Sequence, residues 1–298
     1  MTSARAFIVR HPVPVYFGLT FAISWGGAAV AIAGGGGISW PVVVDPRFAY
    51  AVAAMLAGPS ISGVLLTALV EGKAGLRDLL RRTLRARVAL RWHAAALLTA
   101  PLLWIATLAA LTSTSPAFLP GIVTATDRME LVRLGMAVGL GAAAFEEIGW
   151  TGFASPHVRQ RYGVFATGLI VGVLWGAWHL LTNVFWAIGA TSGELPLSIF
   201  VPLSVIGMLI GYLAAFRVLM VWLYERTGSV FLAIAMHASL TASVLILDPA
   251  GLSGAALLTY TFALAAVVWA TVVIVARRYG WHRAQPALRE IGRRRLAG

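Results

Sequence analysis

The chain has 298 residues, of which 59% are hydrophobic and 11% charged, and its formal net charge is +12. Soluble domains carry roughly 25% charged residues, and disordered chains are poor in apolar ones. The composition therefore excludes an ordinary water-soluble enzyme and a disordered chain. Because the sequence contains no cysteine, disulfides, thiolate metal sites and a cysteine nucleophile are excluded as well.

Apolar runs separated by short polar breaks predict membrane-spanning helices, since about 20 residues cross a ~30 Å hydrocarbon layer. We expect an all-α polytopic membrane bundle of about eight such helices. In chain order the expected spans are 16–33, 50–70, 94–111, 131–154, 164–183, 198–224, 230–247 and 255–276. A cleaved signal peptide is the alternative for the first span, because Arg5 and Arg10 precede it and small residues end it.

The segment 75–91 is too charged to cross a membrane. Its apolar residues recur at helical spacing, with arginines mostly on other faces: Leu76, Leu79, Leu80, Leu84 and Val88. This pattern predicts an amphipathic helix on the inner membrane surface, with anionic lipid as its partner. An ordinary basic loop is the alternative.

The basic residues predict the orientation of the bundle. With the N-terminus inside, 20 basic residues fall on the inner side and 3 on the outer side. This asymmetry predicts a cell-membrane protein with both termini cytoplasmic. Arg217 is counted at the inner end of the sixth span, with a snorkelling side chain. The basic tail 289–295 is interpreted as a topology anchor and not as a nucleic-acid site, and the arginine-rich usage favours a bacterial source.

Four ionisable residues lie deep inside the expected spans: Glu146 and Glu147 in the fourth, His179 in the fifth and His237 in the seventh. Each costs at least ~2.5–3.5 kcal/mol at membrane depth, so such residues usually face the bundle interior and have a function. We expect the four to meet at one polar site. The structural alternative is that each of these side chains makes a separate hydrogen bond and has no shared function. A proton or ion transporter is the other alternative, because buried Glu and His also form ion pathways.

The positions of these residues in their helices add two expectations. Adjacent residues on a helix point about 100° apart, so one glutamate should face the centre of the site and the other support it. Glu146 and His237 lie at similar depths, but His179 lies roughly 11 Å further from the inner side at 1.5 Å per residue. The fifth span should therefore be tilted or displaced, or its ends should differ from those expected.

Three motifs on separate spans carry a family resemblance. The first reads Glu146-Glu147-Ile148-Gly149-Trp150-Thr151-Gly152-Phe153, the second Trp175-Gly176-Ala177-Trp178-His179 and the third His237-Ala238-Ser239-Leu240-Thr241. In order and spacing they resemble the CAAX prenyl endopeptidase and bacteriocin-processing (CPBP, or Abi) intramembrane proteases. Thr151 stands where that family usually has Arg, and Thr241 where Asn is typical, so residues elsewhere would have to compensate.

The resemblance implies hydrolysis of a peptide bond in a membrane-associated peptide or protein. Glu146 would activate water and His179 would hold or polarise it. His237, helped by Thr241, would stabilise the oxyanion, and Glu147 would orient the group. No cofactor is favoured, although zinc held by Glu146, His179 and His237 is the alternative.

The resemblance also divides the chain. Residues 1–130 would form an N-terminal membrane region, 131–247 the catalytic core, and 248–298 the last span and a basic cytoplasmic tail. A non-catalytic immunity or binding protein of the same fold remains the main functional alternative.

Overall fold

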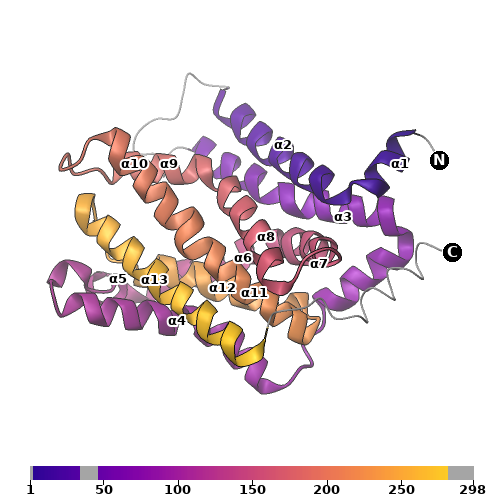
Figure 1. Cartoon of the computed structure of the whole chain (residues 1–298). Coiled ribbons are helices and arrows are strands. Elements are labelled where there is room, and N and C mark those ends of the chain that lie inside the picture. The colour runs from indigo at the N-terminus through magenta and orange to yellow at the C-terminus, as the bar shows by residue number, and fades with distance from the viewer. Residues whose placement is uncertain (1–2, 34–45, 281–298) are drawn as a thin grey trace.

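The computed structural model describes residues 3–33 and 46–280, and within these ranges it contains helices and no strands (Figure 1). The helices run α1 Ser3–Arg10, α2 Pro12–Ala33, α3 Pro46–Thr83, α4 Leu90–Thr112, α5 Gly121–Thr124, α6 Arg128–Gly149, α7 Ser155–Arg159, α8 Val164–Trp178, α9 Leu180–Gly189, α10 Leu197–Ile206, α11 Ala214–Thr227, α12 Val230–Leu247 and α13 Gly254–Tyr279. A short 3₁₀ turn, η2, covers Pro116–Phe118, and two π-helical turns, η3 and η4, cover Trp150–Ala154 and Gly207–Leu213.

The predicted fold class, an all-α polytopic membrane bundle, is confirmed. Six described helical stretches are long and apolar enough to cross a membrane, and the bent pair α8 and α9 makes a seventh. The remaining expected span, the fourth, at 131–154, begins within α6, which does not reach that standard and carries the charged residues Arg133, Glu146 and Glu147. Each of the eight expected spans nevertheless coincides with a helical stretch.

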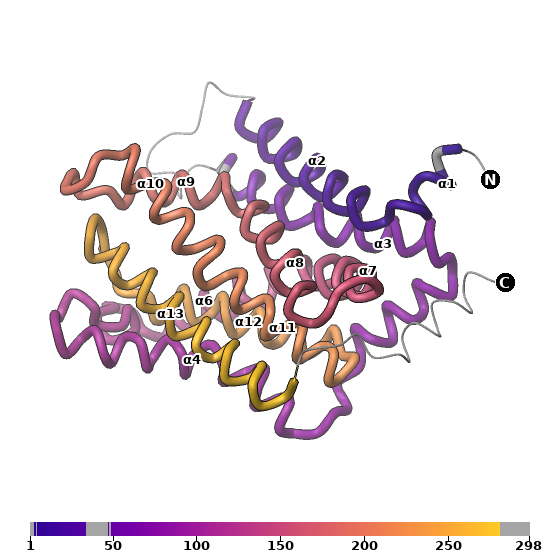
Figure 2. Tube along the Cα trace, in the orientation of Figure 1, coloured from indigo at the N-terminus to yellow at the C-terminus, as the bar shows by residue number. Residues whose placement is uncertain are grey.

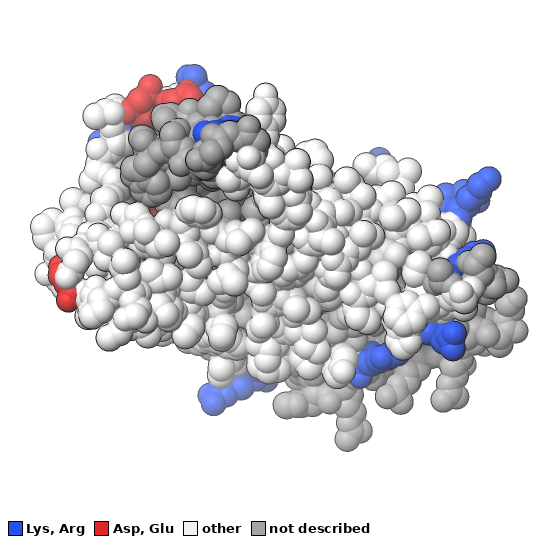
Figure 3. All heavy atoms as spheres, turned by 90° about the horizontal axis from the view of Figure 1, so that it is seen from above, with Lys and Arg blue, Asp and Glu red and all other residues white. Residues whose placement is uncertain are grey.

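The outer surface of the bundle is apolar, and several charged side chains lie inside it. In Figure 3 the broad central surface is white, with the visible charged side chains at its periphery. Large hydrophobic residues such as Leu102 and Leu140 are exposed, whereas Glu147 and Arg217 are fully buried. This distribution is the reverse of a soluble protein's and fits a bundle surrounded by lipid.

Glycines let the helices that carry the expected site residues approach closely. Helix α6 packs along α12, and α8 packs along α11 (Figure 2). A Cβ atom at Gly139 of α6 would lie 2.6 Å from the carbonyl oxygen of Ala238 on α12. On α8, Gly168, Gly172 and Gly176 face α11 or η4 in the same way. Small residues at such crossings are the usual means of packing membrane helices.

The expected amphipathic helix is shorter than predicted. Helix α3 breaks at Gly72, whose φ of 66° suits glycine, then continues to Thr83, and the chain is not helical again until Leu90. The side chain of Arg82 turns into the protein, where it donates to the hydroxyl of Tyr224 at 2.8 Å. The contact of this segment with anionic lipid stays a prediction. The basic tail 289–295 lies outside the described residues.

The contact of α6 with α12 gives a test of the fold. We expect Gly139→Ala to lower the free energy of unfolding by about 1–3 kcal/mol, because the new methyl group would overpack against the α12 backbone. Gly141→Ala on the same helix is the matched control, since a Cβ atom there meets nothing within 4 Å. Unfolding of the two variants in detergent would measure the difference, and equal stability would contradict the close packing described here.

Candidate active site

The two glutamates lie in the last turn of α6, where the helix changes its hydrogen-bonding pattern. Asp127 caps the start of α6 by accepting from the backbone N–H of Glu130 at 2.9 Å. At the other end, the N–H of Trp150 is shared by the carbonyl oxygens of Glu146 and Glu147, and the π-helical turn η3 follows. Single π-helical turns are frequent at functional sites. Glu146 is 2% exposed and Glu147 fully buried.

Glu147 binds side chains from three different helical elements. Its Oε2 accepts from the Arg217 Nη1 of α11 at 2.8 Å and from the hydroxyl of Thr151 in η3. Its Oε1 lies 2.7 Å from the Nδ1 of His237 on α12. An imidazole N–H donated to a carboxylate fixes the orientation of the ring. Glu147 therefore holds His237 in place and is itself held by Arg217.

Glu146 accepts two hydrogen bonds on one oxygen. The indole nitrogens of Trp175 and Trp150 donate to its Oε2 at 2.7 and 3.2 Å. Its other oxygen, Oε1, lies 4.0 Å from the Nε2 of His237. Both atoms of the His237 ring that can carry a proton thus face a glutamate, Nδ1 toward Glu147 and Nε2 toward Glu146.

His179 lies at the bend between α8 and α9, where the helix axis turns by 57°. Its Nδ1 lies 2.9 Å from the carbonyl oxygen of Trp175, and its ring contacts those of Trp175 and Trp178 edge-on. The fifth expected span is thus not one straight helix, but the helix from Val164 to Trp178 is unbroken, so a bend that follows it does not account for the depth mismatch expected from the sequence. His179 is joined to the glutamates through Trp175, and no direct hydrogen bond between them exists among the described contacts.

Of the five expected site residues, the structure brings Glu146, Glu147 and His237 together and places His179 beside them. Thr241 lies one turn after His237 on α12, and within the described residues it makes no hydrogen bond to this group. The roles expected of these residues stay predictions.

Arg217 is the main correction to the sequence analysis. We expected its side chain to snorkel at the inner end of its span, but it is fully buried and pairs with Glu147. Its guanidinium also lies 4.1 Å from the ring centre of Trp175, a cation–π distance. The positive charge that Thr151 cannot provide therefore comes from another helix. A lone arginine within an apolar run was the signal that could have identified it.

Trp150 and Trp175 were also missed as partners of Glu146. Both lie in the sequence motifs, but aromatic residues in a membrane helix are usually packing residues. Only the indole N–H distinguishes their role from that of phenylalanine, and its direction cannot be obtained from spacing.

The residues of the expected zinc set do not form a metal-ligating arrangement. Within the ranges that the structure describes, no group of three or more His, Asp and Glu side chains could hold a metal ion. Glu147 occupies the Nδ1 side of His237, and the Nδ1 of His179 is bonded to the backbone. We derive no step through a metal.

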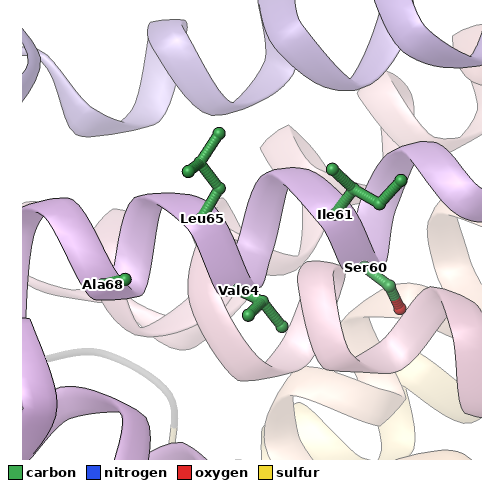
Figure 4. A pocket seen from close by; sticks show the side chains of 5 residues that line it. All are labelled: Ser60, Ile61, Val64, Leu65 and Ala68. Carbon is green, nitrogen blue, oxygen red and sulfur yellow. The ribbon is translucent and has the colours of Figure 1, made fainter.

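A shallow groove on the outer face of α3 is separate from this group. Figure 4 shows its lining residues Ser60, Ile61, Val64, Leu65 and Ala68. The hydroxyl of Ser60 already donates to the carbonyl oxygen of Phe145 on α6, and the other four side chains are hydrocarbon. The groove therefore presents no group for chemistry.

Comparison with known proteins supports the family resemblance. Residues 128–243 match the model of the family described as type II CAAX prenyl endopeptidase Rce1-like. A segment of 38 residues, 13% of this chain, is 42% identical to the CAAX prenyl protease 2 of Methanococcus maripaludis, and it spans 14% of that relative's length. The resemblance drawn from the three motifs is therefore confirmed.

The Arg217–Glu147 pair gives a test of the site. We expect Arg217→Met to destabilise the protein by about 3–5 kcal/mol, because it leaves a buried carboxylate without a counter-charge. Arg226→Met, on the exposed end of the same helix, is the control and should change stability little. Unfolding in detergent compares the two, and a similar small effect of both would contradict the buried ion pair.

Proposed function

We propose that this chain, a membrane protein whose residues 128–243 match the Rce1-like CAAX endopeptidase family, hydrolyses a peptide bond of a membrane-associated peptide or protein. The main support for this proposal is a buried pair of atoms, the Oε1 of Glu146 and the Nε2 of His237, which lie 4.0 Å apart. A general base acts on a water held about 2.6–3.2 Å away. The separation of the two atoms permits one water to contact both.

In the proposed reaction, Glu146 takes a proton from this water while the water oxygen attacks the carbonyl carbon of the peptide bond. The carbonyl oxygen becomes an oxyanion in the tetrahedral intermediate. Glu146 then returns the proton to the leaving nitrogen as the carbon–nitrogen bond breaks. His179 would hold or polarise the water. No covalent enzyme intermediate is needed, because water attacks directly.

His237 and Thr241 would stabilise the oxyanion. The Nδ1 of His237 faces the Glu147 carboxylate at 2.7 Å, which fixes the direction in which Nε2 points. In a ring that carries a proton on each nitrogen, the Nε2–H would donate to the oxyanion. The Thr241 hydroxyl, one helical turn further on α12, would be the second donor.

The substrate class follows from the position of the site. The candidate group lies among membrane-spanning helices, and we therefore propose a substrate that is anchored in the same membrane. The relative from Methanococcus maripaludis is named as a CAAX prenyl protease. We extend to this chain only the class of a membrane-anchored peptide or protein. We also propose cytoplasmic termini and contact of the basic segment 75–91 with anionic lipid.

Cleavage of membrane-anchored peptides by the purified, detergent-solubilised protein tests this function. We expect Glu146→Gln to lower the rate roughly 10²–10⁴-fold, the usual contribution of a general base. Glu130→Gln is the matched control, because this glutamate lies on the same helix but is exposed at its other end. His179→Ala should also reduce the rate strongly.

Each reaction is run with and without a chelator. Cleavage that depends on Glu146 and survives the chelator is the expected result. Loss of cleavage with the chelator and its recovery with Zn²⁺ would overturn the proposed mechanism in favour of a metalloprotease. A folded wild type that cleaves none of the membrane-anchored peptides would favour a non-catalytic binding protein.

A further inference from the structure

The indole groups around Glu146 are arranged in a way that packing alone does not require. Trp150 comes from η3 and Trp175 from α8, yet both N–H groups converge on the Oε2 of Glu146, at 3.2 and 2.7 Å. Both tryptophans are buried, with exposures of 0% and 1%. The Oε1 of Glu146 is left facing His237. The two oxygens of one carboxylate therefore have different surroundings.

An indole is suited to this position by its chemistry. Its N–H is a donor only, so it stabilises a carboxylate without competing for the proton that a general base must accept. Hydrogen bonds to a charged acceptor are also stronger than those between neutral groups. Phenylalanine would keep an aromatic ring at either position but would remove that donor to Oε2 at membrane depth.

Each tryptophan is held in place by its neighbours. The face of Trp175 lies under the Arg217 guanidinium at 4.1 Å, and its ring contacts those of His237 and His179 at 5.1 and 5.3 Å. Trp150 packs against the rings of Tyr16 and Phe17 of α2, at 5.5 and 5.7 Å between ring centres. The direction of both N–H groups is therefore fixed before any substrate binds.

We propose that Trp150 and Trp175 are positioning residues that orient the Glu146 side chain, with Oε2 bound to both indoles and Oε1 directed toward His237, where it can act on a water. This inference rests on the proposed function for its kinetic consequence. The two hydrogen bonds themselves do not depend on that function.

The hydrogen bonds are tested by the indole ¹H–¹⁵N spectrum of the full chain in detergent, with all 11 tryptophans labelled. We expect Glu146→Gln to move two indole signals upfield, because a neutral acceptor replaces a charged one. Trp150→Phe and Trp175→Phe should each remove one of these two signals. Trp222→Phe removes a control signal, from a buried indole that has no hydrogen-bond acceptor.

The positioning role is tested by kinetics. We expect Trp175→Phe to lower kcat roughly ten- to a hundred-fold, the worth of a hydrogen bond to a charged group, with KM nearly unchanged. Trp150→Phe should have a smaller effect because its bond is longer, and Trp222→Phe should have none. A kcat of Trp175→Phe equal to that of the wild type would overturn the positioning role while the proposed function stands.

The indole spectrum tests the two hydrogen bonds to Glu146 even if the kinetic experiment gives no result. If the wild type cleaves nothing, the proposed function fails, and unchanged indole signals in Glu146→Gln would overturn the indole contacts separately. If Trp175→Phe does not fold, Glu146→Gln still keeps both tryptophans. Movement of the Trp150 signal and one other is then the supporting result.

Discussion

The Glu147 carboxylate and the Arg217 guanidinium form an ion pair that is buried inside the bundle. The guanidinium is fully buried and lies 2.8 Å from the carboxylate, and Glu147 also binds His237 at 2.7 Å. An isolated charge at this depth costs at least ~2.5–3.5 kcal/mol, so separating the two side chains inside the bundle is unfavourable. The pair joins α6, α11 and α12, and the candidate active site is assembled around it.

The rest of the bundle is built so that these three helices can meet. Gly139 brings α6 against α12, and Gly172 brings the Cα of Ala214 on α11 close to α8. Each partner of the ion pair lies near a π-helical turn. The turn η3 follows the end of the helix that carries Glu147, and η4 directly precedes the helix that carries Arg217. The fifth span is also irregular, since it bends by 57° at His179. Close packing and local irregularity both serve the position of the site.

The sequence predicted most of the fold, because hydrophobic length is a strong signal in membrane proteins. It also identified Glu146, Glu147, His179 and His237, because ionisable residues inside apolar runs are rare and have few explanations. It misplaced Arg217, since an arginine near a span end can either snorkel or turn inward, and only its packing partners decide. The helix expected over 75–91 ends at Thr83, and the side chain of Arg82 binds Tyr224, a contact that the spacing of the residues does not reveal.

The central claim is that Glu147 and Arg217 depend on each other inside the bundle, and a double-mutant cycle tests it most directly. Unfolding is measured for Glu147→Gln, Arg217→Met and the protein with both changes. If the pair is interdependent, the double variant should be at least as stable as the less stable single variant. Its loss in free energy of unfolding should be much smaller than the sum of the two single losses, because removing both charges leaves neither unpaired. Losses that simply add would contradict it, since additive effects indicate that the two side chains act independently.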